Sequence, residues 1–283
     1  MDVLRRLRGE AKVSTPSSYG PARRASSLSP AASLVRRNDP DRFLTALFAP
    51  APRRETLFVL YAFNSELARA RAVVSEPMLA LMRLQWWREV VEGARLRHEV
   101  AGPLGAALDA GALRAEDLAP LVDAREIEAE PAIPTLEDWR GYLMGSAGGL
   151  AVSAGRLLGA PDPEALRGPG AAYGAAGVLR AAPALARRQR CLLPADVLAR
   201  HGLSVEAAVA APLDAPALAA MRDLAREARG WLGPRDMGLP REARAAALPA
   251  VLARRDLARP PPLPEQRGFA DRLAVVTVGL LGR

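Results

Sequence analysis

The chain has 283 residues, of which half are hydrophobic and 25% are charged, and its formal net charge is +8. This length suits one large domain or two small ones with a sizeable core. The arginines are dispersed and aromatic residues make up only 5%, which argues against stacking platforms for single strands, so we expect no nucleic-acid partner. Cys191 is the only cysteine, and His98 and His201 are the only histidines. A single cysteine excludes an internal disulfide and favours the cytoplasm. So few cysteines and histidines also argue against a zinc site.

The first 38 residues are rich in Arg, Ser and Pro and contain only two acidic residues. This composition is similar to a mitochondrial presequence and also to a disordered basic tail. We predict a disordered tail over residues 1–38, followed by a single all-α domain over residues 39–283.

Apolar residues recur at spacings of three and four along most of the remaining chain, which predicts helices nearly throughout. One helix starts after the prolines near residue 50 and runs to about Val74. Tyr61, Asn64 and Ala68 lie along one of its faces. Ser75 is predicted to cap the next helix.

Small residues are concentrated further along the chain. Thr135 and Asp138 predict a capping box at the start of a helix that carries a glycine-rich segment over 145–155. Glycine in a helix costs about 1 kcal/mol relative to alanine. Such a segment, together with the small residues over 171–177, favours a central cavity with room for a ligand, or alternatively close packing between helices.

The last part of the chain has ten residues, 273–282, without a charge. This run is too short to cross a bilayer, and no stretch of about 20 apolar residues is present elsewhere, so we expect no transmembrane helix. A core helix and an interfacial anchor both remain open for this segment.

Two segments resemble the aspartate-rich motifs of the squalene/phytoene synthase family of isoprenoid synthases. RETLFVLYAFNSELARARAVV is similar to the helix of the first motif. GVLRAAPALARRQRCLLPAD is similar to the second motif, with its arginine-rich turn and L-P-x-D sequence. The resemblance covers about residues 40–255. It implies the all-α isoprenoid-synthase fold with a central cavity.

The resemblance fails at the positions that carry the family's chemistry. In the family, two pairs of aspartates, each four residues apart on one helix face, hold Mg²⁺ ions that neutralise a diphosphate leaving group. Here the first pair is replaced by Ala68 and Ala72 and the second by Ala181 and Leu185. These side chains cannot ligate a metal. We therefore expect no catalytic residue, no metal and no cofactor at these positions.

Acidic residues elsewhere leave a rebuilt magnesium site open. The nearest candidates in sequence are Glu66, Glu76, Glu89, Glu92, Asp123, Glu126 and Glu128. The alternative is that these residues pair with the many arginines. The resemblance also implies ligand-binding candidates at Tyr61, Asn64, Arg180, Arg187 and Arg188.

The amino-acid sequences of both segments resemble those of one branch of the family, which includes a mitochondrial complex I assembly factor and its bacterial homologues. This implies a non-catalytic role in assembling respiratory NADH dehydrogenase. Its partner would be a complex I subunit or assembly intermediate, or an isoprenoid or lipid ligand. The alternative function is Mg²⁺-dependent head-to-head prenyl transfer on C15 or C20 diphosphates. The expected location is the cytoplasm, with peripheral contact at the inner face of the cytoplasmic membrane, or the mitochondrial matrix side in a eukaryote.

Overall fold

The computed structural model describes residues 28–74 and 76–281. This part of the chain forms helices and contains no strand, which confirms the all-α prediction. The helices are α1 (Pro30–Asn38), α2 (Pro40–Ala46), α3 (Ala51–Ala72), α4 (Pro77–Val91), α5 (Ala101–Asp109), α6 (Ala115–Asp123), η1 (Glu126–Ala129), α7 (Leu136–Leu143), η2 (Met144–Gly148), α8 (Gly149–Leu158), η3 (Pro163–Leu166), α9 (Arg167–Ala186), α10 (Ala195–Arg200), α11 (Val205–Ala210), α12 (Ala215–Arg229), α13 (Arg244–Leu257) and α14 (Phe269–Leu281).

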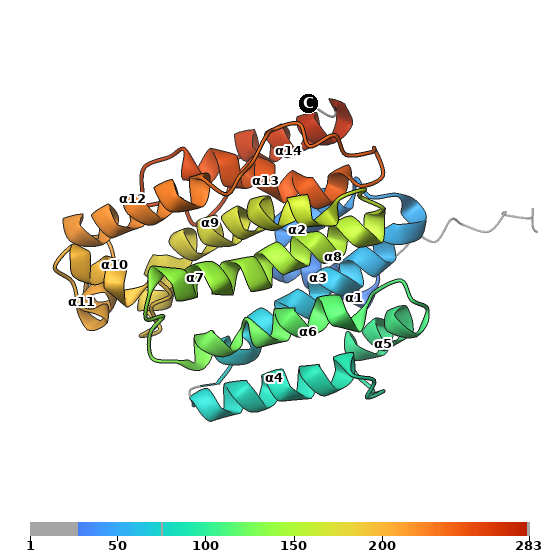
Figure 1. Ribbon diagram of the computed structural model, residues 1–283, viewed down its shortest axis with the longest axis horizontal. Helices are drawn as coiled ribbons and strands as arrows, with labels where there is room; N and C mark the ends of the chain where they lie inside the picture. The colour runs from blue at the N-terminus through green and yellow to red at the C-terminus, as the bar shows by residue number, and fades with distance from the viewer. Residues whose placement is uncertain (1–27, 75, 282–283) are drawn as a thin grey trace, which may run out of the picture.

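The long helices lie side by side in layers (Figure 1). Helices α4, α5 and α6 form one side of the molecule, and α13 and α14 form the opposite side. Between them, α3 packs against α4 and α8, and α9 packs against α8, α12 and α13. The two helices with degenerate motifs, α3 and α9, therefore both lie in the interior of the bundle.

The predicted boundary of the N-terminal tail at residue 38 is wrong, because residues 30–38 form helix α1. Ser29 caps this helix by accepting a hydrogen bond from the Ala32 amide at 3.0 Å. Leu34 and Val35 are fully buried and α1 packs against α3. Burial of its apolar face stabilises this short helix. The basic composition of the segment did not predict it. The part of the predicted tail over residues 1–27 lies outside the described residues.

The glycine-rich segment mostly serves close packing between helices. A Cβ atom at Gly145 would lie 2.7 Å from the Cβ of Ala124, and one at Gly149 would lie 2.8 Å from a methyl group of Leu121. Separations this short require the absence of a side chain. Gly177 on α9 differs, because a Cβ there would meet no atom within 4 Å. The small residues therefore bring helices together, and only a few of them leave open space.

Local signals in the middle of the chain are confirmed. Thr135 and Asp138 form the predicted capping box at the start of α7, and Ser204 caps α11. Pro183 lies inside α9, and the helix ends at Ala186, less than one turn later, because proline disfavours a helix interior. Ser75, the predicted cap of α4, lies outside the described residues.

The apolar C-terminal segment forms α14, which is not a core helix. Asp271 and Val275 are its buried residues, whereas several of its large apolar side chains are exposed. Across the described residues, no helix combines the length and the apolar content needed to span a bilayer.

Candidate functional site

A cleft of about 700 Å³ opens between α3 and α9 and is the main candidate site. All four degenerate motif positions line it: Ala68 and Ala72 from α3, and Ala181 and Leu185 from α9. The structure thus brings the two motifs to one cavity, as the resemblance implied. At each of these positions the cleft wall is a hydrocarbon side chain.

The rest of the cleft wall is strongly basic. Its lining includes eight arginines and four carboxylates, an excess of four positive charges. The arginines are Arg42, Arg69, Arg125, Arg180, Arg188, Arg190, Arg267 and Arg272, and the carboxylates are Asp39, Asp41, Glu128 and Glu265. A concave surface with this imbalance attracts anions.

One group of cleft residues is organised around the buried Glu128. Its carboxylate accepts hydrogen bonds from Arg125 at 2.6 Å and from the Tyr142 hydroxyl at 2.8 Å, and it lies 3.5 Å from the Arg190 guanidinium. Arg125 also donates to the Asn64 side-chain oxygen at 3.2 Å. Burial raises the pKa of Tyr142, and the Glu128 charge adds to this effect. Tyr142 therefore stays protonated and remains a donor to Glu128.

A second group surrounds the buried Asp256 of α13, which lies behind the cleft wall that its partners Arg180 and Arg267 line. Asp256 is 1% exposed and pairs with Arg180 of α9. Arg267 lies 2.8 Å from the same carboxylate and also pairs with Asp41 at the start of α2. Arg180, a predicted ligand-binding candidate, is thus held in an ion pair that joins α9 to α13.

Tyr61 lies behind this wall rather than on the cleft surface. It is buried at 2% exposure, and the Arg42 guanidinium lies over its ring at 5.7 Å. Arg42 also lies over the Tyr173 ring at 4.7 Å. Burial raises the pKa of Tyr61 to about 12. Tyr61 therefore supports Arg42, which does face the cleft.

The remaining predicted candidates, Arg187 and Arg188, lie in the arginine-rich turn after α9 and have different surroundings. Arg187 points to Glu265, with 3.1 Å between guanidinium and carboxylate, and both groups are exposed. Arg188 lines the cleft, as does Arg272 of α14. Within residues 28–74 and 76–281, neither Arg188 nor Arg272 has a charged partner. These two exposed guanidinium groups are available to an anionic ligand.

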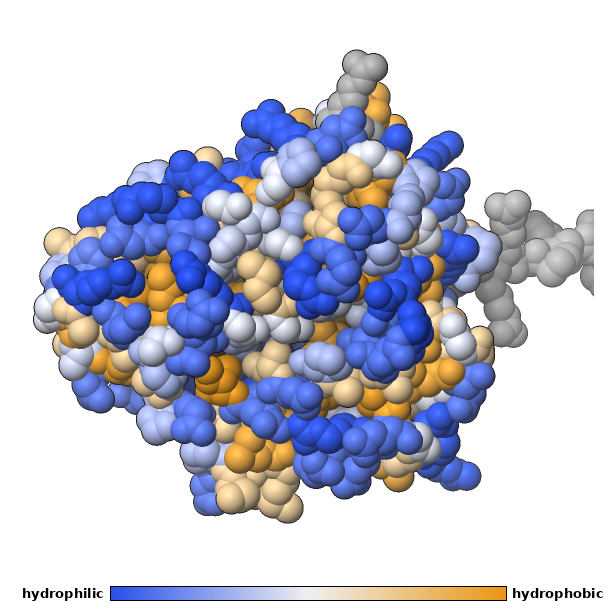
Figure 2. All heavy atoms as spheres, in the orientation of Figure 1, coloured by the Kyte–Doolittle hydropathy of each residue, from blue (hydrophilic) through white to orange (hydrophobic). Residues whose placement is uncertain are grey.

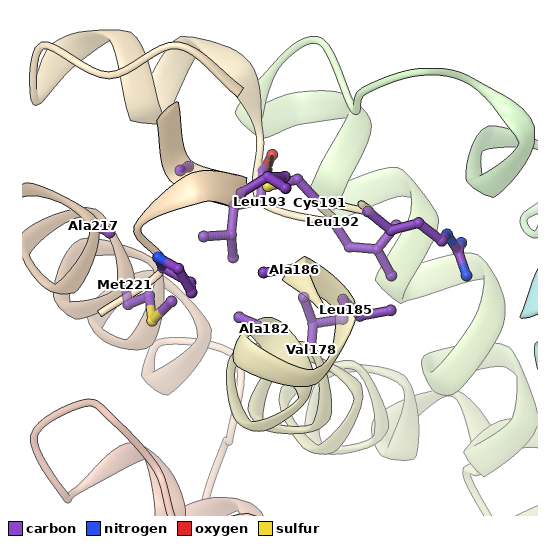
Figure 3. Close-up of a pocket in the computed structure, with 13 residues that line it drawn as sticks. Val178, Ala182, Leu185, Ala186, Cys191, Leu192, Leu193, Ala217 and Met221 are labelled. Atoms are coloured by element: carbon purple, nitrogen blue, oxygen red, sulfur yellow. Dashed lines mark hydrogen bonds between the residues drawn. The ribbon is translucent and has the colours of Figure 1, made fainter. Parts of the chain in front are cut away.

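A narrow apolar crevice adjoins the cleft (Figure 3). Val178, Leu185, Arg190 and Leu192 line both spaces. Figure 3 shows Leu185 and Ala182 of α9 opposite Met221 of α12, with the segment Cys191–Leu193 closing one side. The crevice has about 10 Å³ of free space, enough for about one water molecule. The crevice is therefore too small for an isoprenoid chain.

The sequence profile of squalene/phytoene synthases matches residues 35–272. The chain belongs to the squalene/phytoene synthase family. Solved members share its fold: a dehydrosqualene synthase superposes with a TM-score of 0.68 at 16% identity, covering 89% of this chain and 94% of that one. Squalene synthase HpnC from Alicyclobacillus acidocaldarius superposes with a TM-score of 0.62 at 18% identity, covering 81% of this chain and 90% of the other.

The relatives that match this chain by sequence are named as complex I assembly factors and not as synthases. The human protein called NADH dehydrogenase (ubiquinone) complex I, assembly factor 6 is 32% identical over 181 residues, which is 61% of this chain and 54% of the human protein. The Drosophila melanogaster homolog of that factor is 30% identical over 191 residues, 62% of this chain and 56% of the fly protein. The chain therefore spans about half the length of the curated relatives that it matches.

The cleft residues of this family member do not fit the magnesium ions that the motif resemblance implies. Mg²⁺ needs near-octahedral oxygen ligands, and the four motif positions offer none. Of the four lining carboxylates, Asp39 pairs with Arg42, Asp41 with Arg267, and Glu128 and Glu265 pair as described above. Within the described residues, no group of three or more Asp, Glu, His or Cys side chains could hold a metal ion.

Of the seven acids named as possible substitutes, four are paired with arginine, and the other three, Glu76, Glu89 and Glu92, do not line the cleft. Glu66 is buried and accepts a hydrogen bond from Arg69 at 2.9 Å. Asp123 and Glu126 both pair with Arg88, at 2.6 and 2.7 Å, and neither lines the cleft. Glu128 is the one member of this group that reaches the cleft wall. Arg125 and Tyr142 both donate to its Oε1, and Arg190 lies 3.5 Å from its Oε2.

Several cleft residues had no signal in the sequence. Asp41 and Arg267 are 226 residues apart, and Asp256 is 76 residues from Arg180. Only the fold brings these groups together beside α9. Arg42 and Arg272 likewise follow no motif. A pattern search can place residues on one helix face, but it cannot pair helices that lie far apart in sequence.

Proposed function

We propose that this chain assists the assembly of respiratory NADH dehydrogenase (complex I) and does not catalyse prenyl transfer. The observation that carries the proposal is the loss of all four motif carboxylates from a cleft that is otherwise retained. The role in assembly is supported by relatives, 30 to 32% identical, that are named as complex I assembly factor 6. No metal cofactor forms part of the proposal.

In the proposed role, the cleft holds the anionic end of an isoprenoid or lipid through guanidinium groups instead of metal ions. Charge-assisted hydrogen bonds from arginine suit phosphate and carboxylate groups. Arg188 and Arg272 are the best placed to make such bonds, because Arg180, Arg125 and Arg267 already bind carboxylates. The small crevice accommodates little of an apolar tail, so the tail would remain at the mouth of the cleft.

The proposed protein partner is a complex I subunit or an assembly intermediate. The proposed location follows from this partner: the cytoplasm, with peripheral contact at the inner face of the cytoplasmic membrane, or the matrix side in a mitochondrion.

The alternative is a Mg²⁺-dependent head-to-head prenyl transferase acting on C15 or C20 diphosphates. It is favoured by the retained cleft and by the shared fold with a dehydrosqualene synthase. It would require carboxylates to be released from arginine and to converge near Ala68 and Ala181.

Deletion of the gene separates the two functions. We expect membranes of the deletion strain to lose NADH:quinone oxidoreductase activity while carotenoid and squalene contents stay unchanged. Complementation with the intact gene should restore the activity. Loss of carotenoid or squalene with unchanged complex I activity would favour the transferase.

A further inference from the structure

The exposed side of α14 carries a continuous apolar stripe. Phe269, Leu273, Val276 and Leu280 recur at spacings of four, three and four residues, which places them on one side of the helix. Phe269 is 80% exposed and Leu280 is 71% exposed. The buried residues Asp271 and Val275 lie on the opposite side, against α13. The stripe therefore points away from the body of the protein.

The apolar surface continues beyond α14. The Phe48 ring packs against Gly279, where an added Cβ would lie 2.6 Å from it. Leu47, the preceding residue, is 43% exposed. Figure 2 shows hydrophobic atoms gathered over α14 near the upper edge of the molecule, bordered by hydrophilic ones.

The exposed charged residue of α14 is positive, whereas its acidic residue is buried and neutralised. Asp271, the acidic residue of α14, is buried and bound by Arg255 at 2.6 Å and Arg259 at 2.7 Å. Arg272 is exposed at the border of the stripe and also lines the cleft. The whole chain carries a net charge of +8. This surface is complementary to a negatively charged one.

The size and shape of the stripe favour a bilayer over a second protein. A helix of 13 residues is about 20 Å long, so a stripe one helix wide offers roughly 200 Å² of contact. Stable protein interfaces use about 800 Å² on each partner. A convex apolar ridge with an exposed arginine at its border, here Arg272, instead suits a helix that lies in the headgroup region of a membrane.

We infer that the exposed face of α14 is a docking surface for an anionic lipid bilayer. Phe269, Leu273 and Leu280 enter the boundary between headgroups and acyl chains, and Arg272 contacts the headgroups. Because Arg272 also lines the cleft, docking in this way places the mouth of the cleft at the membrane surface. The inference rests on the proposed peripheral membrane contact and identifies the surface that makes it.

Co-sedimentation with vesicles tests this inference on the full chain. We expect binding to phosphatidylcholine vesicles that contain phosphatidylglycerol, and at least tenfold weaker binding to phosphatidylcholine alone. The variant Leu273→Glu/Leu280→Glu should bind the anionic vesicles at least tenfold more weakly. Arg272→Ala should weaken binding about fivefold, since one arginine near an anionic surface contributes about 1 kcal/mol.

The matched control is Met78→Glu/Met82→Glu on α4, where two exposed apolar side chains of similar size, 64% and 61% exposed, are changed in the same way. This variant should bind within twofold of the parent. Unchanged binding by the α14 variant, or equal loss in the α4 control, would overturn the inference. Self-association that the α14 substitutions abolish, seen by sedimentation velocity, would assign the stripe to a second copy instead. The vesicle assay does not involve complex I, so its failure leaves the assembly role standing.

Discussion

The cleft contains two kinds of arginine that differ in what surrounds them. Arg125, Arg180 and Arg267 are largely buried and bind Glu128, Asp256 and Asp41. Arg188 and Arg272 are exposed and lack a charged partner in the described part of the chain. The first kind connects helices, and removing a partner leaves a buried charge. The second kind remains free to bind an anion. Arginines that line the same cleft therefore have different roles.

This difference also explains how the cleft persists without metal. In the family motif, carboxylates attract cations and the cations hold the ligand. Here the carboxylates that reach the cleft are neutralised by arginines from other helices, and the excess charge is positive. Ion pairs join the elements that form the cleft walls, and Tyr142 and Tyr173 contribute to the lining.

The largest expected effect comes from breaking a buried pair. Asp256→Ala should lower the free energy of unfolding by about 3–5 kcal/mol, because Arg180 and Arg267 would stay buried without their shared carboxylate. Denaturant unfolding measures this loss. The matched control is Glu265→Ala on the rim, which should cost about 1 kcal/mol or less, since its pair with Arg187 is exposed. Similar losses in both variants would remove the distinction between the two kinds of arginine.

Acid sensitivity should come partly from Asp271. The guanidinium of Arg259, together with that of Arg255, lowers the pKa of Asp271 to about 2, whereas an unfolded chain has a value of about 3.9. Because the folded pKa is the lower one, this contribution is complete above about pH 4 and is lost as the pH falls toward 2. The difference corresponds to about 2.5 kcal/mol.

The variant Asp271→Asn isolates this contribution. Its free energy of unfolding should be about 2.5 kcal/mol lower than that of the parent at pH 7, and the gap should narrow between about pH 4 and pH 2.5. Unfolding measured by circular dichroism across this range gives the two curves. Parallel curves would show that Asp271 does not titrate as described.

Restoring the lost carboxylates should create the missing metal affinity. We expect the variant with Asp at positions 68, 72, 181 and 185 to bind a non-hydrolysable diphosphate analogue at least tenfold more tightly when magnesium is present, because each Asp pair shares one helix face toward the cleft. Calorimetry with and without magnesium measures the change. Tight, magnesium-dependent binding by the parent would mean that other acids have rebuilt the site.

The smallest expected effect concerns the exposed arginines. Arg188→Ala/Arg272→Ala should weaken binding of inorganic diphosphate about threefold to tenfold, because each solvent-exposed charge contribution is about 0.2–1 kcal/mol. Stability should change by less than about 0.5 kcal/mol. Arg97→Ala, at an exposed site outside the cleft, is the control and should leave diphosphate binding unchanged. If Arg97→Ala weakened diphosphate binding equally, the effect would come from the net charge of the protein and not from the cleft.

The helical fold and the capping box of Thr135 and Asp138 could be predicted from the sequence because they depend on local spacing. The facing of the two degenerate motifs could be expected only from the family resemblance. Ala68 and Ala181 meet at one cleft as the motif resemblance implied. The pairing of Arg180 with Asp256, 76 residues away, could not be predicted, since it depends on how α9 and α13 pack. Helix α1 was missed because its apolar residues lie within a strongly basic segment. The exposure of α14 was left open because periodicity does not show which elements cover a helix.

Diphosphate release by the purified protein shows whether the cleft has lost prenyl-transfer catalysis. The protein would be incubated with farnesyl or geranylgeranyl diphosphate and magnesium, with an active squalene synthase assayed in parallel. We expect no release above the rate without protein, because no carboxylate stands at the four motif positions of the cleft. Turnover of about 1 per second, typical of enzymes, would contradict the account and make the chain a prenyl transferase.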